Sequence, residues 1–124
     1  MAALNRVQII GNLGADPKTR EISRDRKVTS FRVAVNRRWR NANKEIQEET
    51  MWFSVEAWAG LGDVCARYLK KGRSVYVEGR LKINEWDDTE GGHHERTVVV
   101  ARDVQFLGEV GRSETQIEEP ETSF

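Results

Sequence analysis

Apolar and polar residues alternate along most of the first 107 positions, a pattern that predicts β-strands with one buried face. Five segments carry it: "LNRVQIIGNLG", "VTSFRVAVN", "MWFSVEAWAG", "RSVYVEGRLKIN" and "RTVVVARDVQFLGEV". The polar run "ADPKTREISRDRK", which Pro17 interrupts, predicts a loop or a short hairpin. The alternation predicts these inward-facing residues: Val7, Ile9, Leu13, Phe31, Val33, Val35, Met51, Phe53, Val55, Ala57, Val75, Val77, Leu81, Ile83, Val98, Val100, Val104 and Phe106.

After Gly60 the hydrophobic period changes from 2 to 3.6, which predicts a helix. Lys70 and Lys71 suit the negative C-terminal end of a helix dipole, and Gly72 is placed to cap it. We expect this to be the only helix. Its apolar stripe consists of Leu61, Val64, Cys65, Tyr68 and Leu69.

The order strand-strand-strand-helix-strand-strand is that of an OB-fold. We therefore predict an all-β fold, a five-stranded antiparallel Greek-key barrel with one α-helix between its third and fourth strands. Gly79, inside the fourth strand, indicates a bulge or a tight bend. The polar stretch from Asn36 to about Thr50 is predicted to loop out of the barrel.

The 124 residues suffice for one domain, and their net charge of zero conceals an asymmetry. Residues 1–107 hold 19 Lys and Arg against 15 Asp and Glu, a balance of +4. Residues 108–124 hold one Arg and five Glu, a balance of −4, and show no periodicity. We therefore predict an OB-fold domain over 1–107 and a short, acidic, disordered C-terminal tail over 108–124.

The sequence favours a cytoplasmic protein. No apolar run approaches the length that spans a bilayer, and the N-terminal segment does not resemble a signal peptide. Cys65 is the only cysteine, which suits a reducing compartment. Because Cys65 lies on the apolar stripe of the helix, we expect it to fill the core.

The four tryptophans avoid the predicted inward positions. Trp52 and Trp58 alternate with the inward residues of their segment and are therefore predicted to lie on the same polar face as Glu56. Trp86 continues the polar parity of its strand, and Trp39 lies in the arginine-rich run "NRRWRNANK". One interpretation is that they pack against the helix or a partner subunit. The other is that they offer flat faces to a ligand.

Cations near the tryptophans in the sequence favour the ligand. Aromatic faces interleaved with cations can stack unpaired bases and neutralise phosphates with little sequence preference, and a duplex would hide those base faces. Trp39 is expected on a mobile loop that orders over the bound strand. The predicted DNA-binding residues are Trp39, Trp52, Trp58, Trp86, Arg37, Arg38, Arg40, Lys70, Lys71, Arg73, Arg80 and Lys82.

Residues 4–108 resemble the bacterial single-stranded DNA-binding proteins. The resemblance rests on "LNRVQIIGNLGADPKTR", "FRVAVNRRWR", "TMWFSVEAWAGLGDVCARYLKKGRSVYVEGRL" and "NEWDD", in this order. It implies an OB-fold, a homotetramer, and single-stranded DNA wrapped over aromatics that match the four tryptophans. It also implies a role in DNA replication, recombination and repair. Trp58 stands where many members have Phe, which keeps the aromatic face.

The C-terminal segment departs from the family pattern. Members typically carry a long Gly/Pro/Gln-rich linker and an acidic tip ending in Ile-Pro-Phe that recruits replication and repair proteins. Here the segment is short and ends "IEEPETSF", so the acidic residues and the terminal Phe are kept and the Ile-Pro step is not. The residues expected to contact protein partners are Glu118, Glu119, Glu121 and Phe124.

An enzyme is not expected, and neither is a cofactor or a metal. His93 and His94, with acidic neighbours, are metal-ligand types, but adjacent histidines at a hairpin tip point apart and lack the spacing of a zinc helix. A solvated loop is the simpler interpretation. Two binding alternatives stay open: a primosome-type accessory OB protein that binds DNA weakly, and a protein-binding or sugar-binding OB module.

Overall fold

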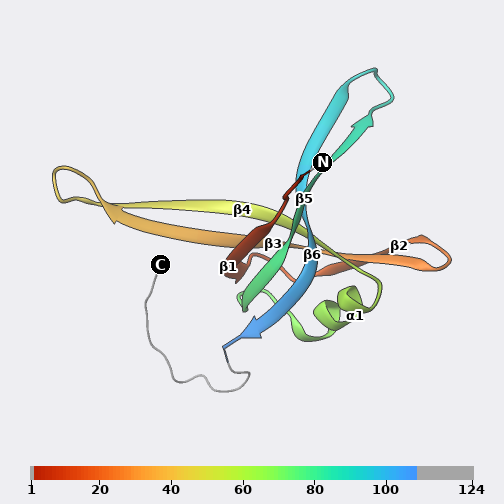
Figure 1. The fold of residues 1–124 in the computed structure, drawn as a ribbon, viewed down its shortest axis with the longest axis horizontal. Helices are drawn as coiled ribbons and strands as arrows, with labels where there is room; N and C mark the ends of the chain where they lie inside the picture. Colours follow the sequence, from red (N-terminus) through yellow and green to blue (C-terminus); the bar gives the residue numbers. More distant parts are fainter. Residues whose placement is uncertain (1, 109–124) are drawn as a thin grey trace.

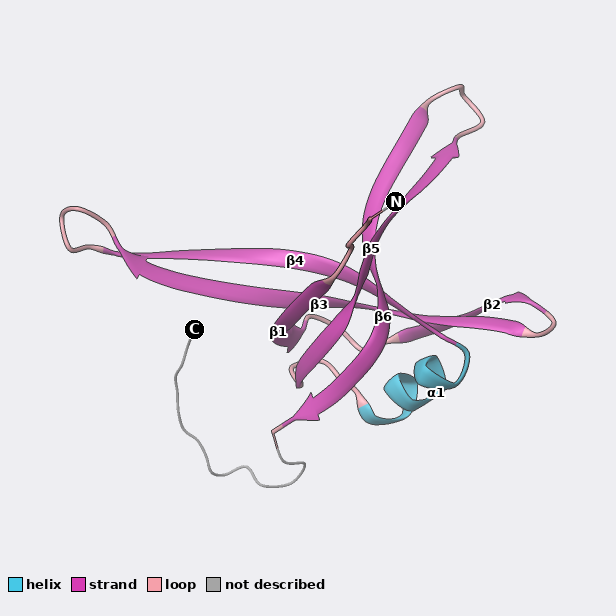
Figure 2. Cartoon of the chain, in the orientation of Figure 1, coloured by secondary structure: helices cyan, strands magenta, loops and turns pink. Residues whose placement is uncertain are grey.

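The computed structural model describes residues 2–108, which form six strands and one helix (Figures 1 and 2). The predicted strands and helix are all present, and the polar run after the first strand forms a short strand of its own. The elements are β1 (Val7–Leu13), β2 (Lys18–Ser23), β3 (Arg26–Arg40), β4 (Ile46–Trp58), α1 (Ala59–Tyr68), β5 (Ser74–Asp87) and β6 (His93–Leu107).

The strands form one closed sheet in the order β1-β5-β6-β4-β3-β2, and an additional pairing of β1 with β3 completes the barrel. This arrangement, with one helix between β4 and β5, confirms the predicted OB-fold class. Two details differ from the simple scheme. β2 adds a sixth strand as a hairpin with β3, and β4 pairs with β6 in parallel at Val55 and Val99.

The predicted inward faces supply most of the core. Val33, Val75 and Val77 are fully buried, and α1 packs against β3, β4 and β6 to close the barrel. β1 and β3 approach so closely that a Cβ on Gly11 would lie 2.2 Å from the carbonyl oxygen of Ala34. The buried cluster consists of Ile9, Leu13, Phe31, Val33, Val55, Ala57, Cys65, Leu69, Val75, Val77 and Val99.

The helix buries a narrower stripe than its sequence predicts. Cys65 is fully buried, as expected of a core residue, and burial raises the pKa of its thiol to about 11. Val64 and Tyr68 were predicted to face the core but are exposed; the ring of Tyr68 packs at the edge of the core against Phe106, with ring centroids 5.7 Å apart. The helix has 10 residues, too few to cross a membrane.

Two long hairpins extend away from the barrel (Figure 1). The β3–β4 arm comprises residues 36–50, and the β5–β6 arm comprises residues 81–97. The first replaces the predicted loop around Trp39, because β3 continues to Arg40 and pairs with Ile46. Ion pairs between directly opposite residues favour this pairing without apolar burial: Arg37 with Glu49 at 3.5 Å and Arg38 with Glu48 at 3.6 Å.

A turn centred on Asn41 joins the two strands of the β3–β4 arm. The Asn41 side-chain oxygen accepts hydrogen bonds from the backbone N–H groups of Asn43 and Glu45. Asparagine favours such turns because its side chain can satisfy backbone donors. The Asn-rich composition that suggested a loop therefore belongs to the hairpin tip alone. Met51, at the base of the arm, was predicted to face inward and is exposed.

The β5–β6 arm corrects two further expectations. Leu81 and Ile83 were predicted to face the core but are 43% and 56% exposed, because β5 runs past the end of the barrel. In β6, Val98 is buried as predicted, but Val99 is buried beside it and Val100 is only half-buried, because the register shifts where Glu78 and Gly79 face Asp103 and Ala101. Arg102 is the extra residue of this bulge.

Candidate nucleic-acid interface

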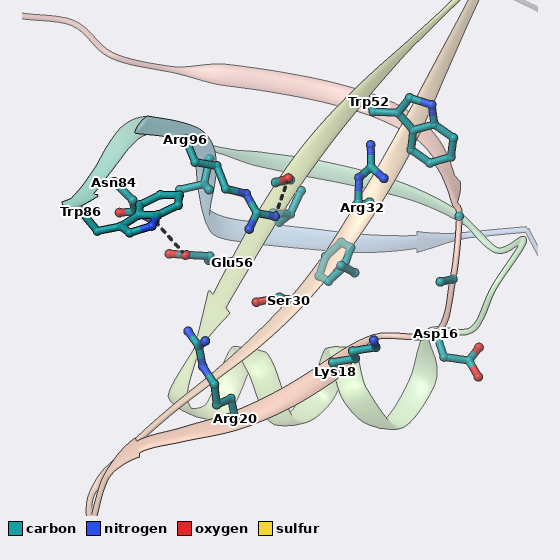
Figure 3. Close-up of a pocket in the computed structure, with 16 residues that line it drawn as sticks. Asp16, Lys18, Arg20, Ser30, Arg32, Trp52, Glu56, Asn84, Trp86 and Arg96 are labelled. Atoms are coloured by element: carbon teal, nitrogen blue, oxygen red, sulfur yellow. Dashed lines mark hydrogen bonds between the residues drawn. The ribbon is translucent and has the colours of Figure 1, made fainter. Parts of the chain in front are cut away.

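A groove of about 730 Å³ lies where the polar face of β3 and β4 meets β2 and the β5–β6 arm (Figure 3). Tryptophans stand at its two ends, Trp52 on β4 and Trp86 on β5, with Arg32 and Arg96 between them. Four cations and two carboxylates line the groove, so its formal charge is +2. They are Lys18, Arg20, Arg32, Arg96, Asp16 and Glu56.

Trp52 is held with one face available. It is 48% exposed, and the Arg32 guanidinium lies 4.6 Å from the centroid of its ring. Its other neighbour is Gly14, where an added Cβ would come within 2.5 Å of the indole. The lack of a side chain at Gly14 therefore leaves room for the edge of the six-membered ring of Trp52.

Trp86 is 49% exposed and stacks on the ring of His94, with centroids 5.4 Å apart and planes at 22°. The Nε2 atom of His94 lies 2.8 Å from Asp88 Oδ2. That contact, with the backbone N–H groups of Gly92 and Glu90, holds the pKa of the Asp88 carboxyl below its usual range. A charged carboxylate thus positions His94, and His94 positions the indole.

The floor of the groove is polar. Asn84 Nδ2 donates a hydrogen bond to Glu56 Oε2 at 3.2 Å, and Arg96 Nη2 donates to the Ser54 hydroxyl at 3.0 Å (Figure 3). The other carboxylate oxygen of Glu56 is buried and has no hydrogen-bond partner among the described residues. These contacts tie the β5–β6 arm to β4 and fix the distance between the two tryptophans.

The other two tryptophans lie outside the groove. Trp58 is half-buried at the start of α1, with the Arg26 guanidinium 4.8 Å from its ring centroid. Trp39 is exposed on the β3–β4 arm, with the Arg37 guanidinium at 4.6 Å. The core contains no tryptophan among the residues the structure describes, which confirms that all four avoid the inward positions.

The predicted cations separate into three places, none of them in the groove. Arg37, Arg38 and Arg40 lie on the β3–β4 arm. Lys70, Lys71 and Arg73 lie in the turn between α1 and β5. On β5, Lys82 is exposed, and Arg80 lines a second hollow together with Arg6, Glu78 and Arg102.

Sequence proximity to a tryptophan was the wrong criterion for finding the groove cations. Arg32 lies opposite Ser54, and Arg96 lies opposite Asn84, on paired strands. Both arginines therefore lie on the polar face of their strand, beside a tryptophan. Strand parity could have identified them. Lys18 and Arg20 lie on β2, whose pairing with β3 the sequence did not define. Glu118, Glu119, Glu121 and Phe124 lie outside the described residues.

Sequence comparison relates the chain to known proteins. The chain matches the model of the "Single-strand binding protein family" over residues 4–107. It is 42% identical over 106 residues to "Single-stranded DNA-binding protein 1" of Chlorobaculum tepidum, covering 85% of this chain and 65% of that protein. It is 40% identical over 111 residues to "Single-stranded DNA-binding protein 1" of Xylella fastidiosa, covering 87% and 80%.

A mitochondrial relative and a solved structure extend the likeness. The "Single-stranded DNA-binding protein, mitochondrial" of Oryctolagus cuniculus is 33% identical over 114 residues, covering 86% of this chain and 77% of that one. The solved structure "Plasmodium falciparum SSB complex with ssDNA" superposes with a TM-score of 0.77 at 29% identity, covering 87% and 98%. With its family match over residues 4–107, this chain belongs to the single-strand binding protein family.

Proposed function

We propose that this chain binds single-stranded DNA with little sequence preference, by stacking bases on its exposed tryptophans and pairing phosphates with nearby cations. The observation that carries the proposal is the groove in which Trp52 and Trp86 face a common space lined by Lys18, Arg20, Arg32 and Arg96. Each stacked base is worth about 1–3 kcal/mol, and stacking tolerates any base because every base has a π-face.

The bound strand continues from the groove onto the arm and the helix end, where Trp39 and Trp58 lie. Both rings are flanked by arginine, which can pair with phosphate and also stack on a base. The arm cations Arg37, Arg38 and Arg40, the turn cations Lys70, Lys71 and Arg73, and the β5 cations Arg80 and Lys82 contribute at its edges.

The family match supports a wider role for the chain. The family is one of binding proteins, and the chain is not an enzyme. We place it in the cytoplasm with the nucleoid, where it protects single strands during replication, recombination and repair. It acts as a homotetramer, and the acidic C-terminal residues recruit replication or repair proteins. A solution mass of four chains, measured without DNA and then with a long oligonucleotide, tests the assembly.

Titration of intrinsic tryptophan fluorescence with oligo(dT) tests the binding mode. Stacking should quench the emission strongly, and Trp52→Ala or Trp86→Ala should each weaken binding by about 1–3 kcal/mol without loss of fold. Tyr68→Ala is the matched control, since Tyr68 is an exposed aromatic on α1 that does not line the groove. Unchanged affinity with lowered thermal stability in the tryptophan variants would refute the proposal.

The salt dependence separates stacking from charge. The logarithm of the binding constant should fall with the logarithm of salt concentration by about 0.7 for each phosphate neutralised on a single strand. Stacking has no such slope, so a salt-resistant part of the affinity should persist. Complete loss of binding in molar salt would reduce the interface to a basic patch.

A further inference from the structure

The distal half of the β5–β6 arm has two unlike faces. Trp86 and His94 stack on the face toward the groove. The opposite face carries Glu85 directly across from Glu95, and Asp87 directly across from His93. His93 and His94 thus lie on opposite faces, as their adjacency predicts, and only His93 is surrounded by carboxylates.

His93 is oriented by one carboxylate and directed toward two others. Its Nδ1 lies 2.9 Å from Asp87 Oδ1, and its Nε2 lies 3.1 Å from Glu85 Oε1. Donor atoms of Glu85, His93 and Glu95 all lie within 4.8 Å of one another. A histidine that donates one ring N–H to a carboxylate and presents the other nitrogen to a ligand set has the arrangement found around bound metal ions.

The negative charge of this face favours the binding of a cation. Glu85 and Glu95 oppose each other across the strands, and directly opposed like charges destabilise a β-ladder. Within residues 2–108, the ion pairs of Glu85 and Asp87 are with His93, and no lysine or arginine pairs with either of them or with Glu95. The pairing of opposite charges that joins the β3–β4 arm is therefore missing here.

We propose that this face binds a divalent first-row transition ion such as Zn²⁺, through His93 Nε2 and the carboxylates of Glu85 and Glu95. Asp87 accepts the Nδ1–H hydrogen bond, which orients the ring so that Nε2 faces the carboxylates of Glu85 and Glu95. Zinc bonds to nitrogen and oxygen at about 2.0–2.2 Å, and the three exposed side chains can close around such an ion by rotamer changes. An imidazole ligand selects against Mg²⁺ and Ca²⁺, which take oxygen ligands.

The bound ion joins β5 to β6 on the face turned away from Trp86. It offsets the repulsion between Glu85 and Glu95 and stiffens a two-stranded segment that is otherwise marginal on its own. DNA in the groove and the ion on the outer face do not compete for the same residues. The site is therefore testable on the free protein.

The experiment is calorimetric titration of the metal-free full chain with ZnCl₂, repeated with Co²⁺ to record its ligand-field absorption. We expect one ion per chain. His93→Ala and Glu95→Gln should each weaken binding by at least about tenfold, and Asp87→Ala by about tenfold through loss of the outer hydrogen bond. His94→Ala is the matched control and should leave zinc affinity unchanged, because His94 faces the groove.

Three results would overturn the site: no zinc binding by the wild-type chain, equal weakening by His93→Ala and His94→Ala, or binding insensitive to both. The last would assign the ion to carboxylates elsewhere. Far-ultraviolet circular dichroism of each variant checks that the fold is retained, and Glu95→Gln gives a second measurement should His93→Ala perturb the arm. Oligo(dT) is absent throughout, so the outcome is independent of the proposed DNA binding.

Discussion

The barrel and its two arms are built from the same strands, yet different interactions stabilise them. In the barrel, alternate residues such as Val33 and Val77 are completely buried. In the arms the strands continue with both faces in solvent, so that Ile46 is 53% exposed and Ile83 56%. Strand pairing therefore extends further than burial does, and a polar sequence that opposes charges in register can remain a strand.

This difference in burial means that the barrel and the arms contribute differently to stability and to binding. The barrel derives its stability from apolar burial, whereas exposed ion pairs such as Arg38 with Glu48 contribute only about 0.2–1 kcal/mol each. The arms carry Trp39 and Trp86 into solvent, where a ligand can reach them. Substitutions of buried residues in the barrel should therefore change folding, and substitutions of exposed tryptophans on the arms should change binding.

The largest expected effect comes from truncating one apolar residue in each region. Leu13→Ala in the barrel should lower the free energy of unfolding by about 2–5 kcal/mol, because it leaves a cavity at a site only 2% exposed. Ile46→Ala in the β3–β4 arm should change it by less than about 0.5 kcal/mol. Denaturant unfolding monitored by circular dichroism measures both. A comparable cost for Ile46→Ala would mean that the arm is buried in an assembly.

The second effect distinguishes the groove from the arm by ligand length. Trp52→Ala should cost about 1–3 kcal/mol of affinity for any oligonucleotide, even one near the short end of the roughly 4–16 nucleotides that an OB-fold covers. Trp39→Ala should cost less on that short strand than on one several times longer, because only the long strand reaches the β3–β4 arm. Fluorescence anisotropy measures both. Equal losses on the short strand would place Trp39 at the centre of the site.

The smallest expected effect is on the pH dependence of stability, and it is tested by comparing the carboxylates of Glu78 and Glu48. Glu78, almost buried in the barrel, accepts a hydrogen bond from the Tyr76 hydroxyl at 2.8 Å and pairs with Arg6 at 2.7 Å and Arg102 at 3.1 Å. The hydroxyl first, and then the two guanidiniums, hold the pKa of this carboxyl below its ordinary value. Its ionised form therefore stabilises the fold above the ordinary carboxyl range, and this contribution is lost as pH falls through the lowered pKa.

Glu78→Gln should accordingly lower the melting temperature at neutral pH, and the difference from wild type should shrink as pH falls below about 4. Glu48→Gln is the arm control: the Glu48 carboxylate is exposed and pairs only with Arg38 among residues 2–108, so its melting temperature should match wild type throughout. A difference for Glu78→Gln that persists unchanged to the lowest pH would show that charge is not its source.

The sequence predicts the fold best where the hydrophobic period is long and uninterrupted. The alternation in β1, β3 and β4 predicts the inward residues of the barrel, and the position of the helix follows from one change of period. The placement of Trp52, Trp58 and Trp86 outside the core followed from parity, and that of Trp39 from its arginine-rich surroundings. That inference needed no knowledge of how the strands pair.

The errors have two physical causes. A period of 2 states which residues share a face but not where the barrel ends, so Leu81 and Ile83 were assigned to a core that does not extend to them. Nor does it reveal an extra residue in one strand, so the buried Val99 was missed and the half-buried Val100 was predicted to face the core. Strand parity alone is enough to place Arg32 and Arg96 in the groove, whereas Lys18 and Arg20 required the pairing of β2 with β3, which the sequence does not define.

The bulge residue Arg102 and the paired residues of β6 differ in how far their loss would disturb this hairpin during evolution. Arg102 has no register partner on β5, so its deletion would restore a regular ladder and leave both faces of the arm as they are. Deleting a paired residue such as Thr97 would instead shift residues 93–96 by one position, and such a shift turns side chains to the other face. His93 would then lie beside Trp86, and His94 would turn toward Glu85. Insertions at the Gly91–Gly92 tip that add one residue to each strand preserve both faces. The β5–β6 arm can therefore lengthen in steps of two residues, whereas loss of one paired residue at its base would exchange its aromatic and acidic faces.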